Sequence, residues 1–242
     1  KILRNSKKIV ISVLSISLAS ALCMQTVYAS IITWGSPTDA SGNISDVVTT
    51  GSLFDSATSY NSDVTVNGQI FNRDLGLSSG TVTFGNSSNI TFTNVQSNVN
   101  YGALPTSGWD ADYLKLVDEG AWKGNGGGLG INIGGLSIGN DYLVQIWNPY
   151  WNNNWQTEYK DEFSNSSGLL NHGLASSGTA PQYVVGTFTA TSTTETILAY
   201  GGSTYAVPGS LQVRNVPEPS VLVLFGAGLL GLGFVRRRKL KA

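Results

Sequence analysis

The sequence predicts an all-β fold in which residues 30–215 form a single β-sandwich. Short runs of β-branched and aromatic residues recur along this part of the chain, and Gly, Asn, Ser, Asp or Pro bounds each run. No stretch of helical length keeps a 3.6-residue hydrophobic period. Many short strands separated by turn residues are typical of a sandwich or jelly roll.

The expected strands follow from alternating polarity or from β-branched runs. "TVNGQIF" (65–71) and "VGTFTATSTTETILAY" (185–200) each have the pattern of a β-hairpin. "GGLSIGNDYLVQIWN" (134–148) predicts a strand end, a tight Gly-Asn turn and a buried strand. On that strand Tyr142, Val144 and Ile146 share one face, and Leu143, Gln145 and Trp147 share the other. In chain order the expected strands are 31–34, 46–50, 63–71, 81–84, 89–93, 113–117, 130–133, 142–147, 183–192, 195–200 and 211–214.

The N-terminal segment, residues 1–29, has the features of a secretory signal helix. A basic cluster precedes an apolar run over 9–22, and Val27-Tyr28-Ala29 places small or β-branched residues where a signal peptidase reads them. The run is shorter than the ~20 residues of a spanning helix, which favours cleavage after Ala29 over a membrane anchor. Cys23, the only cysteine, lies in this segment, so the mature domain is expected to have no disulfide.

Charge is distributed unevenly along the chain. The whole sequence has a net charge of −1, but five basic residues stand against fourteen acidic ones between residues 30 and 215, which gives −9. Nucleic acid is excluded as a partner because its phosphates would repel this domain. Neutral sugars and cations are compatible with it.

The C-terminal segment, residues 216–242, contains glycines in the spacing G-x-G-x-x-G. A dinucleotide site would also need an acidic residue about 20 positions further on, and residues 232–242 contain no acid. Residues 221–235 are instead an apolar run of about 22 Å as a helix. Such a short transmembrane helix can span a bilayer that thins around it, and the basic tail 236–242 favours the cytoplasmic side.

Pro217, Glu218 and Pro219 stand directly before this run, and an arginine cluster follows it. This order of parts resembles the PEP-CTERM sorting signal, a tail also labelled ice-binding protein C-terminal domain. The resemblance implies that an exosortase-type enzyme recognises the Pro-Glu-Pro motif. It also implies an exported precursor anchored in the inner membrane, which is then processed for the cell surface or the extracellular matrix.

Three stretches of the central domain carry a second resemblance: "ITWGSPTDASGNISDVVTTGSL", "LSIGNDYLVQIWN", and "VGTFTATSTTETILAYGG" with the later "LQVRNVPEPS". They are similar to a recurring ectodomain of PEP-CTERM proteins. The similarity implies a jelly-roll, galactose-binding-like fold. It brings no catalytic residues onto this sequence.

The segment "WNPYWNNNWQTEYKDEF" (147–163) combines aromatic residues with amides. Aromatic faces cover the apolar side of sugar rings and amides reach sugar hydroxyls, so this composition on a loop predicts a carbohydrate-binding site. The alternative is that the tryptophans fasten a long loop to the sandwich and the asparagines form turns. Trp147 alternates with its strand and is interpreted as structural. The candidate sugar-binding residues are Tyr150, Trp151, Asn153, Trp155 and Tyr159.

Acidic and amide residues in two loops offer the oxygen ligands that Ca²⁺ takes in irregular loops. Asp39, Asn43 and Asp46 lie in the first loop, and Asp141 stands before a later strand. A structural Ca²⁺ site is one hypothesis for them and plain Asx turns are the other. No other cofactor is expected.

An enzyme is the competing class of function. His172, the only histidine, lies in a Ser- and Gly-rich loop and is interpreted as solvated, so neither a catalytic triad nor a zinc site is expected. An ice-binding face is a further hypothesis, because Thr187, Thr189 and Thr191 alternate, although Thr is a common strand residue. Paired carboxylates would suit glycoside hydrolysis, and the candidates are Asp110 with Asp112, Asp118 with Glu119, and Glu158 with Asp161 and Glu162.

These observations together predict an exported, non-catalytic protein of the cell surface or exopolysaccharide matrix that binds polysaccharide. The expected partners are an exosortase-type enzyme, the membrane through the C-terminal helix, and polysaccharide. A glycan hydrolase and a purely structural surface protein remain as alternatives.

Overall fold

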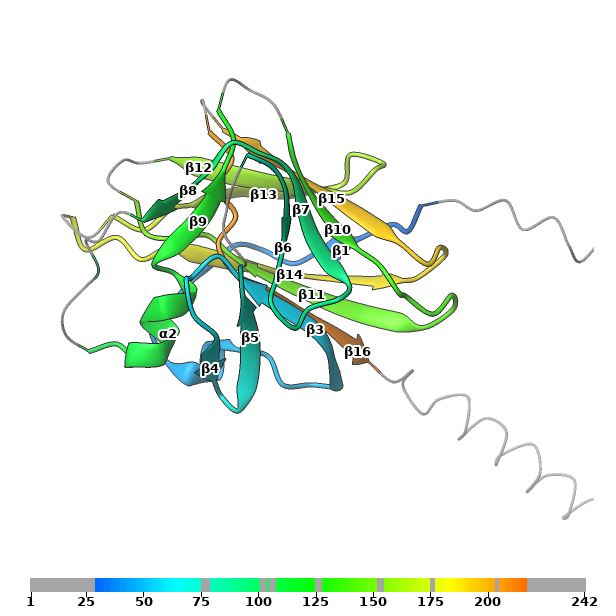
Figure 1. Cartoon of the computed structure of the whole chain (residues 1–242), viewed down its shortest axis with the longest axis horizontal. Helices are drawn as coiled ribbons and strands as arrows, with labels where there is room; N and C mark the ends of the chain where they lie inside the picture. The colour runs from blue at the N-terminus through cyan, green and yellow to red at the C-terminus, as the bar shows by residue number, and fades with distance from the viewer. Residues whose placement is uncertain are drawn as a thin grey trace, which may run out of the picture.

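The computed structural model describes residues 29–74, 79–100, 104, 108–124, 128–151, 155–174, 177–202 and 205–216. Within these ranges, two β-sheets pack as a sandwich, and a two-stranded sheet and one short α-helix accompany them (Figure 1). The predicted all-β sandwich is therefore confirmed. The predictions for the signal segment before Ala29, the sorting motif, the transmembrane helix, the basic tail and Asn153 lie outside the described residues.

The larger sheet has eight strands and the smaller main sheet has six. Neighbouring strands run antiparallel, except that β3 and β5 are parallel. The larger sheet has the order β1 (Thr33–Trp34), β14 (Gln182–Thr189), β11 (Asp141–Trp147), β16 (Leu211–Val216), β3 (Ser52–Thr58), β5 (Gln69–Arg73) and β4 (Val64–Val66), with β2 (Thr38–Asp39) paired to β14. The six-stranded sheet has the order β13 (Ser166–Asn171), β12 (Gln156–Lys160), β15 (Glu195–Gly201), β10 (Leu129–Ile133), β7 (Ile90–Val95) and β6 (Gly80–Thr83), and β8 (Ser97–Asn100) pairs with β9 (Glu119–Trp122).

Strand β11 has two buried faces, as its sequence predicts. Tyr142, Val144 and Ile146 point into the main hydrophobic core. On the opposite face, Trp147 belongs to a second, smaller core. Gln145 is fully buried on that face and donates from Nε2 to the Asp46 carbonyl at 2.7 Å. The strand is thus covered on both sides, which explains its continuous run of apolar residues.

The second core lies between the larger sheet and helix α2 (Ala111–Leu116). Asp110 is the N-cap of the helix, and its side chain accepts hydrogen bonds from the backbone N–H groups of Asp112 and Tyr113. Its buried Tyr113 accepts a hydrogen bond from Trp147 Nε1 at 3.0 Å. The sequence-based strand at 113–117 is therefore wrong: the N-cap and the contact with Trp147 stabilise a helix there.

Two of the expected turns behave differently from each other. The hairpin at 65–71 is confirmed: Asn67 and Gly68 have φ values of 50° and 71°, as a two-residue turn between β4 and β5 requires. The prediction of a hairpin at 185–200 is wrong, because β14 and β15 belong to opposite sheets and the chain crosses the sandwich between them.

Several further strands lack a strong local signal. Residues 46–50 contain the end of a 3₁₀ helix, η1 (Ile44–Asp46), in place of the expected strand. β3, β8, β9, β12 and β13 were not expected, and β12 and β13 occupy segments that the sequence suggested were loops. Among the described residues, no helix has the length and hydropathy needed to cross a membrane.

Candidate functional site

The aromatic segment 147–163 is divided between β11, a connection and β12. Three of its five candidate residues are in the interior: Tyr150 is 5% exposed, Trp151 is 3% exposed and Tyr159 is fully buried. Trp155 is half-buried. A buried ring has no free face to offer a sugar, so the expectation of sugar contact is corrected for Tyr150, Trp151 and Tyr159.

The partners of these rings explain their burial. The Tyr159 hydroxyl donates to Asn148 Oδ1 at 2.7 Å, and Asn148 Nδ2 donates to the Leu170 carbonyl at 2.9 Å. Tyr150 lies against Gly173, where an added Cβ would come within 2.4 Å of the Tyr150 ring. These residues join β11, β12 and β13 to one another, which is the fastening role considered for the tryptophans.

A row of half-buried rings remains at the surface and consists of Trp122, Tyr205 and Trp155. The ring centroids of Trp155 and Tyr205 are 4.3 Å apart, and those of Trp122 and Tyr205 are 5.4 Å apart. The row continues inward through Trp151 to the imidazole of His172. Because β9, the residue before β12 and the segment before β16 each supply one ring, only the folded domain brings this row together.

A cavity of about 380 Å³ lies beside Trp155. Two of its polar side chains bond to each other, since Gln156 Nε2 donates to Asn171 Oδ1 at 2.9 Å. The backbone N–H of Asn171 donates to Gln182 Oε1 at 2.8 Å. Gln182 in turn donates to Asp39 Oδ1. The cavity is lined by Trp155, Gln156, Asn171, His172 and Thr179, which are called the amide pocket below.

His172 is buried in the wall of the amide pocket and is 1% exposed, so its interpretation as a solvated loop residue is wrong. Its Nε2 lies 2.8 Å from Thr157 Oγ1, which also accepts the Val207 N–H. We assign the Thr157 hydroxyl as the donor to Nε2, because Nε2 then accepts the hydroxyl proton while the hydroxyl oxygen accepts the Val207 N–H. The proton of the neutral ring then lies on Nδ1, which has no hydrogen-bond partner among the described residues.

Burial lowers the pKa of His172 to about 3. The ring is therefore neutral at physiological pH and is not a proton donor for acid catalysis there. Its Nδ1 is buried as well as unpartnered among the described residues, so the ring forms part of the pocket wall. The two amides, the hydroxyl and the Trp155 ring give the amide pocket the inventory of a sugar-binding site.

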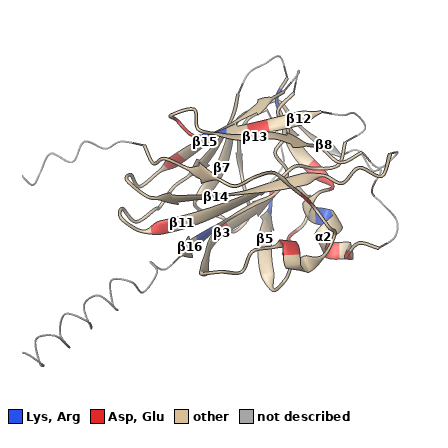
Figure 2. Ribbon diagram, turned by 180° about the vertical axis from the view of Figure 1, so that it is seen from behind, with Lys and Arg blue, Asp and Glu red and all other residues tan. Residues whose placement is uncertain are grey.

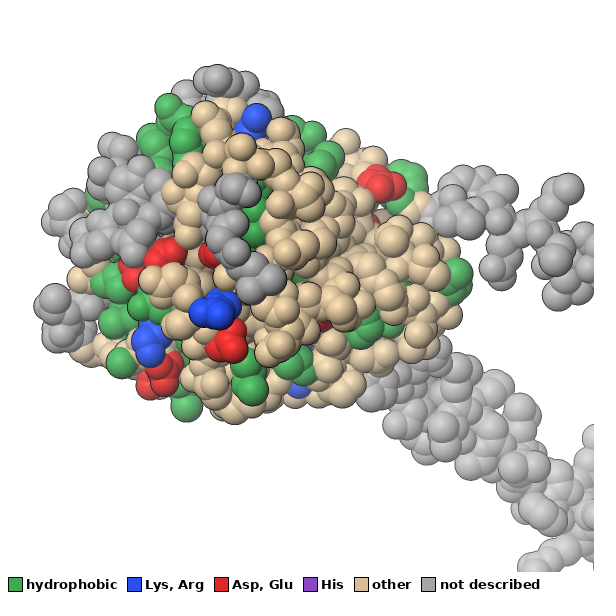
Figure 3. All heavy atoms as spheres, viewed as in Figure 1, with side chains coloured by type: hydrophobic (Ala, Val, Ile, Leu, Met, Phe, Trp, Pro, Cys, Tyr) green, Lys and Arg blue, Asp and Glu red, His purple; other side chains and the backbone are tan. Residues whose placement is uncertain are grey.

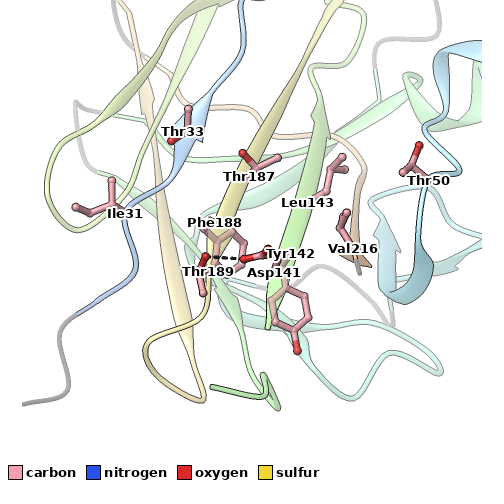
Figure 4. Close-up of a pocket in the computed structure, with 10 residues that line it drawn as sticks. All are labelled: Ile31, Thr33, Thr50, Asp141, Tyr142, Leu143, Thr187, Phe188, Thr189 and Val216. Carbon is pink, nitrogen blue, oxygen red and sulfur yellow. Dashed lines mark hydrogen bonds between the residues drawn. The ribbon is translucent and has the colours of Figure 1, made fainter. Parts of the chain in front are cut away.

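A second cavity, of about 460 Å³, lies at the other end of β14 (Figure 4). Thr33, Thr187 and Thr189 line it beside Leu143, and Thr189 Oγ1 donates to Asp141 Oδ1 at 2.5 Å. Two of the three alternating threonines, Thr187 and Thr189, therefore line a cavity together with Ile31, Leu143 and Val216. The third, Thr191, lies beside Ser30, whose Oγ accepts the Thr191 N–H.

The four candidate Ca²⁺ ligands are divided between distant places. Asp39 pairs with Gln182 at the start of β14, and Asp141 pairs with Thr189 at its end. These two partners are seven residues apart, which is about 23 Å along the strand. Asn43 Oδ1 accepts the Ser45 N–H, and Asp46 accepts from Ser41. These four residues therefore do not share one site. In the described ranges, no group of three or more His, Cys, Asp and Glu side chains could hold a metal ion.

Most of the candidate acid pairs have structural partners. Asp110 caps α2, Asp112 pairs with Lys115, and Glu158 pairs with Lys160. Asp118 differs, because burial and the neighbouring Glu119 raise its pKa to about 6. Charged residues are few and lie apart along the ribbon in Figure 2, and backbone and uncharged polar atoms cover most of the described surface on the face in Figure 3.

The comparisons with known proteins concern the end of the chain. Residues 215–239 match a family model described as the PEP-CTERM protein-sorting motif. The chain therefore carries the motif of a surface protein that exosortase sorts. No match was found among curated proteins or among solved structures.

Proposed function

We propose that this protein is displayed at the cell surface after exosortase processing and binds a neutral polysaccharide, without catalysis, at the amide pocket. The observation that carries the binding proposal is the half-buried Trp155 ring, which lines a cavity together with the side chains of Gln156, Asn171 and Thr179.

The position of the amide pocket supports the proposal. β16 ends at Val216, directly before Pro217, and Val216 pairs with Asp141 at the start of β11. The amide pocket lies at the opposite end of the strands, where Gln182 begins β14. β16 ends at one end of the sandwich (Figure 1), so the amide pocket would lie far from the point where an anchored tail begins.

The charge of the domain supports a neutral ligand. With a net charge of −9 over residues 30–215, the domain repels acidic polymers at long range. Two side-chain amides and a hydroxyl can each bond to neutral sugar hydroxyls. An aromatic surface adds apolar contact with the sugar ring.

Replacing Trp155 by alanine is expected to weaken polysaccharide binding by about 10- to 100-fold, which corresponds to ~1.5–3 kcal/mol for the lost ring contact. The exported protein would be tested on an array of neutral and acidic polysaccharides, followed by titration with a retained one. Trp34→Ala is the matched control, because Trp34 is also half-buried but lies on the edge strand β1. Its binding should be unchanged.

Two outcomes would overturn the binding proposal. One is that no polysaccharide is retained by the wild-type protein. The other is retention that survives Trp155→Ala. The hydrolase alternative has its own signature: release of reducing ends with a pH dependence near 6, abolished in Asp118→Asn, because the raised pKa of Asp118 would serve a general acid.

A further inference from the structure

The first residues of the sandwich are tied to the six-stranded sheet by two acids. Ser30 is fully buried, and its backbone N–H donates to Glu195 Oε2 at 3.2 Å. Two residues later, the Ile32 N–H donates to Asp161 Oδ2 at 2.9 Å. Glu195 begins β15 and Asp161 follows β12. The segment that follows the expected cleavage point is thus held inside the sandwich from its first residue.

Glu195 lacks a positive partner in this position. The residue is 1% exposed, and its second oxygen, Oε1, has no hydrogen-bond partner among the described residues. The charged groups that act on it are Glu162 and Asp161, which are both acidic. The pKa of Glu195 is raised to about 7, mainly by burial and to a smaller extent by these two acids, while the hydrogen bonds from Ser30 lower it. An ionised Glu195 would therefore be poorly stabilised beside a neutral amide.

We propose that cleavage after Ala29 converts the Ser30 nitrogen into an α-ammonium group that forms a buried ion pair with Glu195. In this hydrolysis, water adds to the Ala29 carbonyl carbon and the bond from that carbon to the Ser30 nitrogen breaks. Ala29 leaves with a new carboxyl group, and the released amine takes up a proton. The ammonium has three N–H donors, so it can bond to Oε2 and also to Oε1.

Cleavage would thus lock the new N-terminus into the fold. In the uncleaved chain the folded pKa of Glu195, about 7, lies above its ordinary 4.5. The protonated form of Glu195 therefore contributes fully to the stability of the fold below pH 4.5, and this contribution is lost as the pH rises to about 7. After cleavage the ion pair contributes at pH 7. That contribution is lost above about pH 8, as the pH passes the raised pKa of the amine.

The inference rests on the export part of the proposed function and is independent of sugar binding. It is tested on the protein recovered after export. N-terminal sequencing should find Ser30 first. An amine-acylating reagent at pH 7 should then label the Ser30 amine at least about tenfold more slowly than it labels the free peptide Ser-Ile-Ile-Thr-Trp, because the paired amine reacts only when the segment opens. Lysines of the same molecules report that the reagent is active.

Matched variants separate the ion pair from simple burial. Glu195→Gln removes the negative charge, so the ammonium should leave the interior and label at close to the peptide rate. Glu162→Gln removes a neighbouring but exposed acid, and labelling of the Ser30 amine should stay slow in this variant. A different N-terminal residue, or a wild-type amine that labels as fast as the peptide, would overturn the inference. The wild-type comparison stands even if Glu195→Gln does not fold.

Discussion

Replacing Arg214 by methionine is expected to lower the free energy of unfolding by about 2–4 kcal/mol. Arg214 is 3% exposed, and its guanidinium donates to the carbonyls of Thr49, Thr50 and Gly51 at 2.8–2.9 Å and to the amide oxygen of Gln69 at 2.9 Å. Each hydrogen bond from a charged group contributes ~1.5–3 kcal/mol. The decrease in the free energy of unfolding stays below the sum of these contributions because residues 49–51 are exposed. Water can therefore replace the guanidinium at their carbonyls.

Urea unfolding of the exported protein, followed by circular dichroism, measures this effect. Arg73→Met is the matched control, because Arg73 is an exposed arginine on β5 of the same sheet. Its substitution should change the free energy of unfolding by less than about 0.5 kcal/mol. Equal unfolding midpoints for the two variants would show that the guanidinium does not fasten the 49–51 segment to β16.

Replacing Trp147 by alanine is expected to lower the free energy of unfolding by about 3–5 kcal/mol, the usual range for a large buried aromatic residue. Trp147 is fully buried beneath α2 and makes an edge contact with Phe71 at 5.7 Å between ring centroids. Its Nε1 is the donor to the buried Tyr113 hydroxyl. The substitution leaves a cavity and removes one partner of that hydroxyl.

Trp147→Phe keeps much of the ring volume but removes the indole N–H. Trp147→Phe should therefore lower the free energy of unfolding less than Trp147→Ala does. The phenylalanine variant can still be measured if the alanine variant does not fold. Urea unfolding gives both values. If Trp147→Ala unfolds at the wild-type urea concentration, the second core does not stabilise the domain.

Local pattern was sufficient for the parts of the fold that depend on local chemistry. The face assignment of Tyr142 to Trp147 is confirmed, since a strand places successive side chains on opposite faces whatever it pairs with. The Asn67-Gly68 turn is confirmed for a similar reason, because both residues tolerate a positive φ. The sorting motif was recognisable because it is a short linear sequence.

Strand partners could not be predicted in the same way. β14 and β15 are neighbours in sequence with only 190–194 between them, yet they pair in different sheets. The choice depends on β11 and β10, the strands that each of them meets across long separations in the chain. The helix at 111–116 likewise depends on Trp147, which is far away in sequence.

The candidate site was found in part. Trp155 was singled out for its composition and is half-buried at the amide pocket. Its partners Asn171, His172 and Thr179 were missed, because they come from a Ser- and Gly-rich segment that has the composition of a loop. Burial of Tyr150 and Tyr159 follows from contacts with Gly173 and Asn148, which no local pattern reveals.

The intact mass of the protein recovered from cells that contain exosortase tests the sorting of this protein most directly. The predicted mass is that of a chain that begins at Ser30 and lacks residues 221–242. A variant with both Pro217→Ala and Pro219→Ala should retain those residues, because the recognised motif is gone. A wild-type mass that still includes residues 221–242 would contradict sorting by this motif.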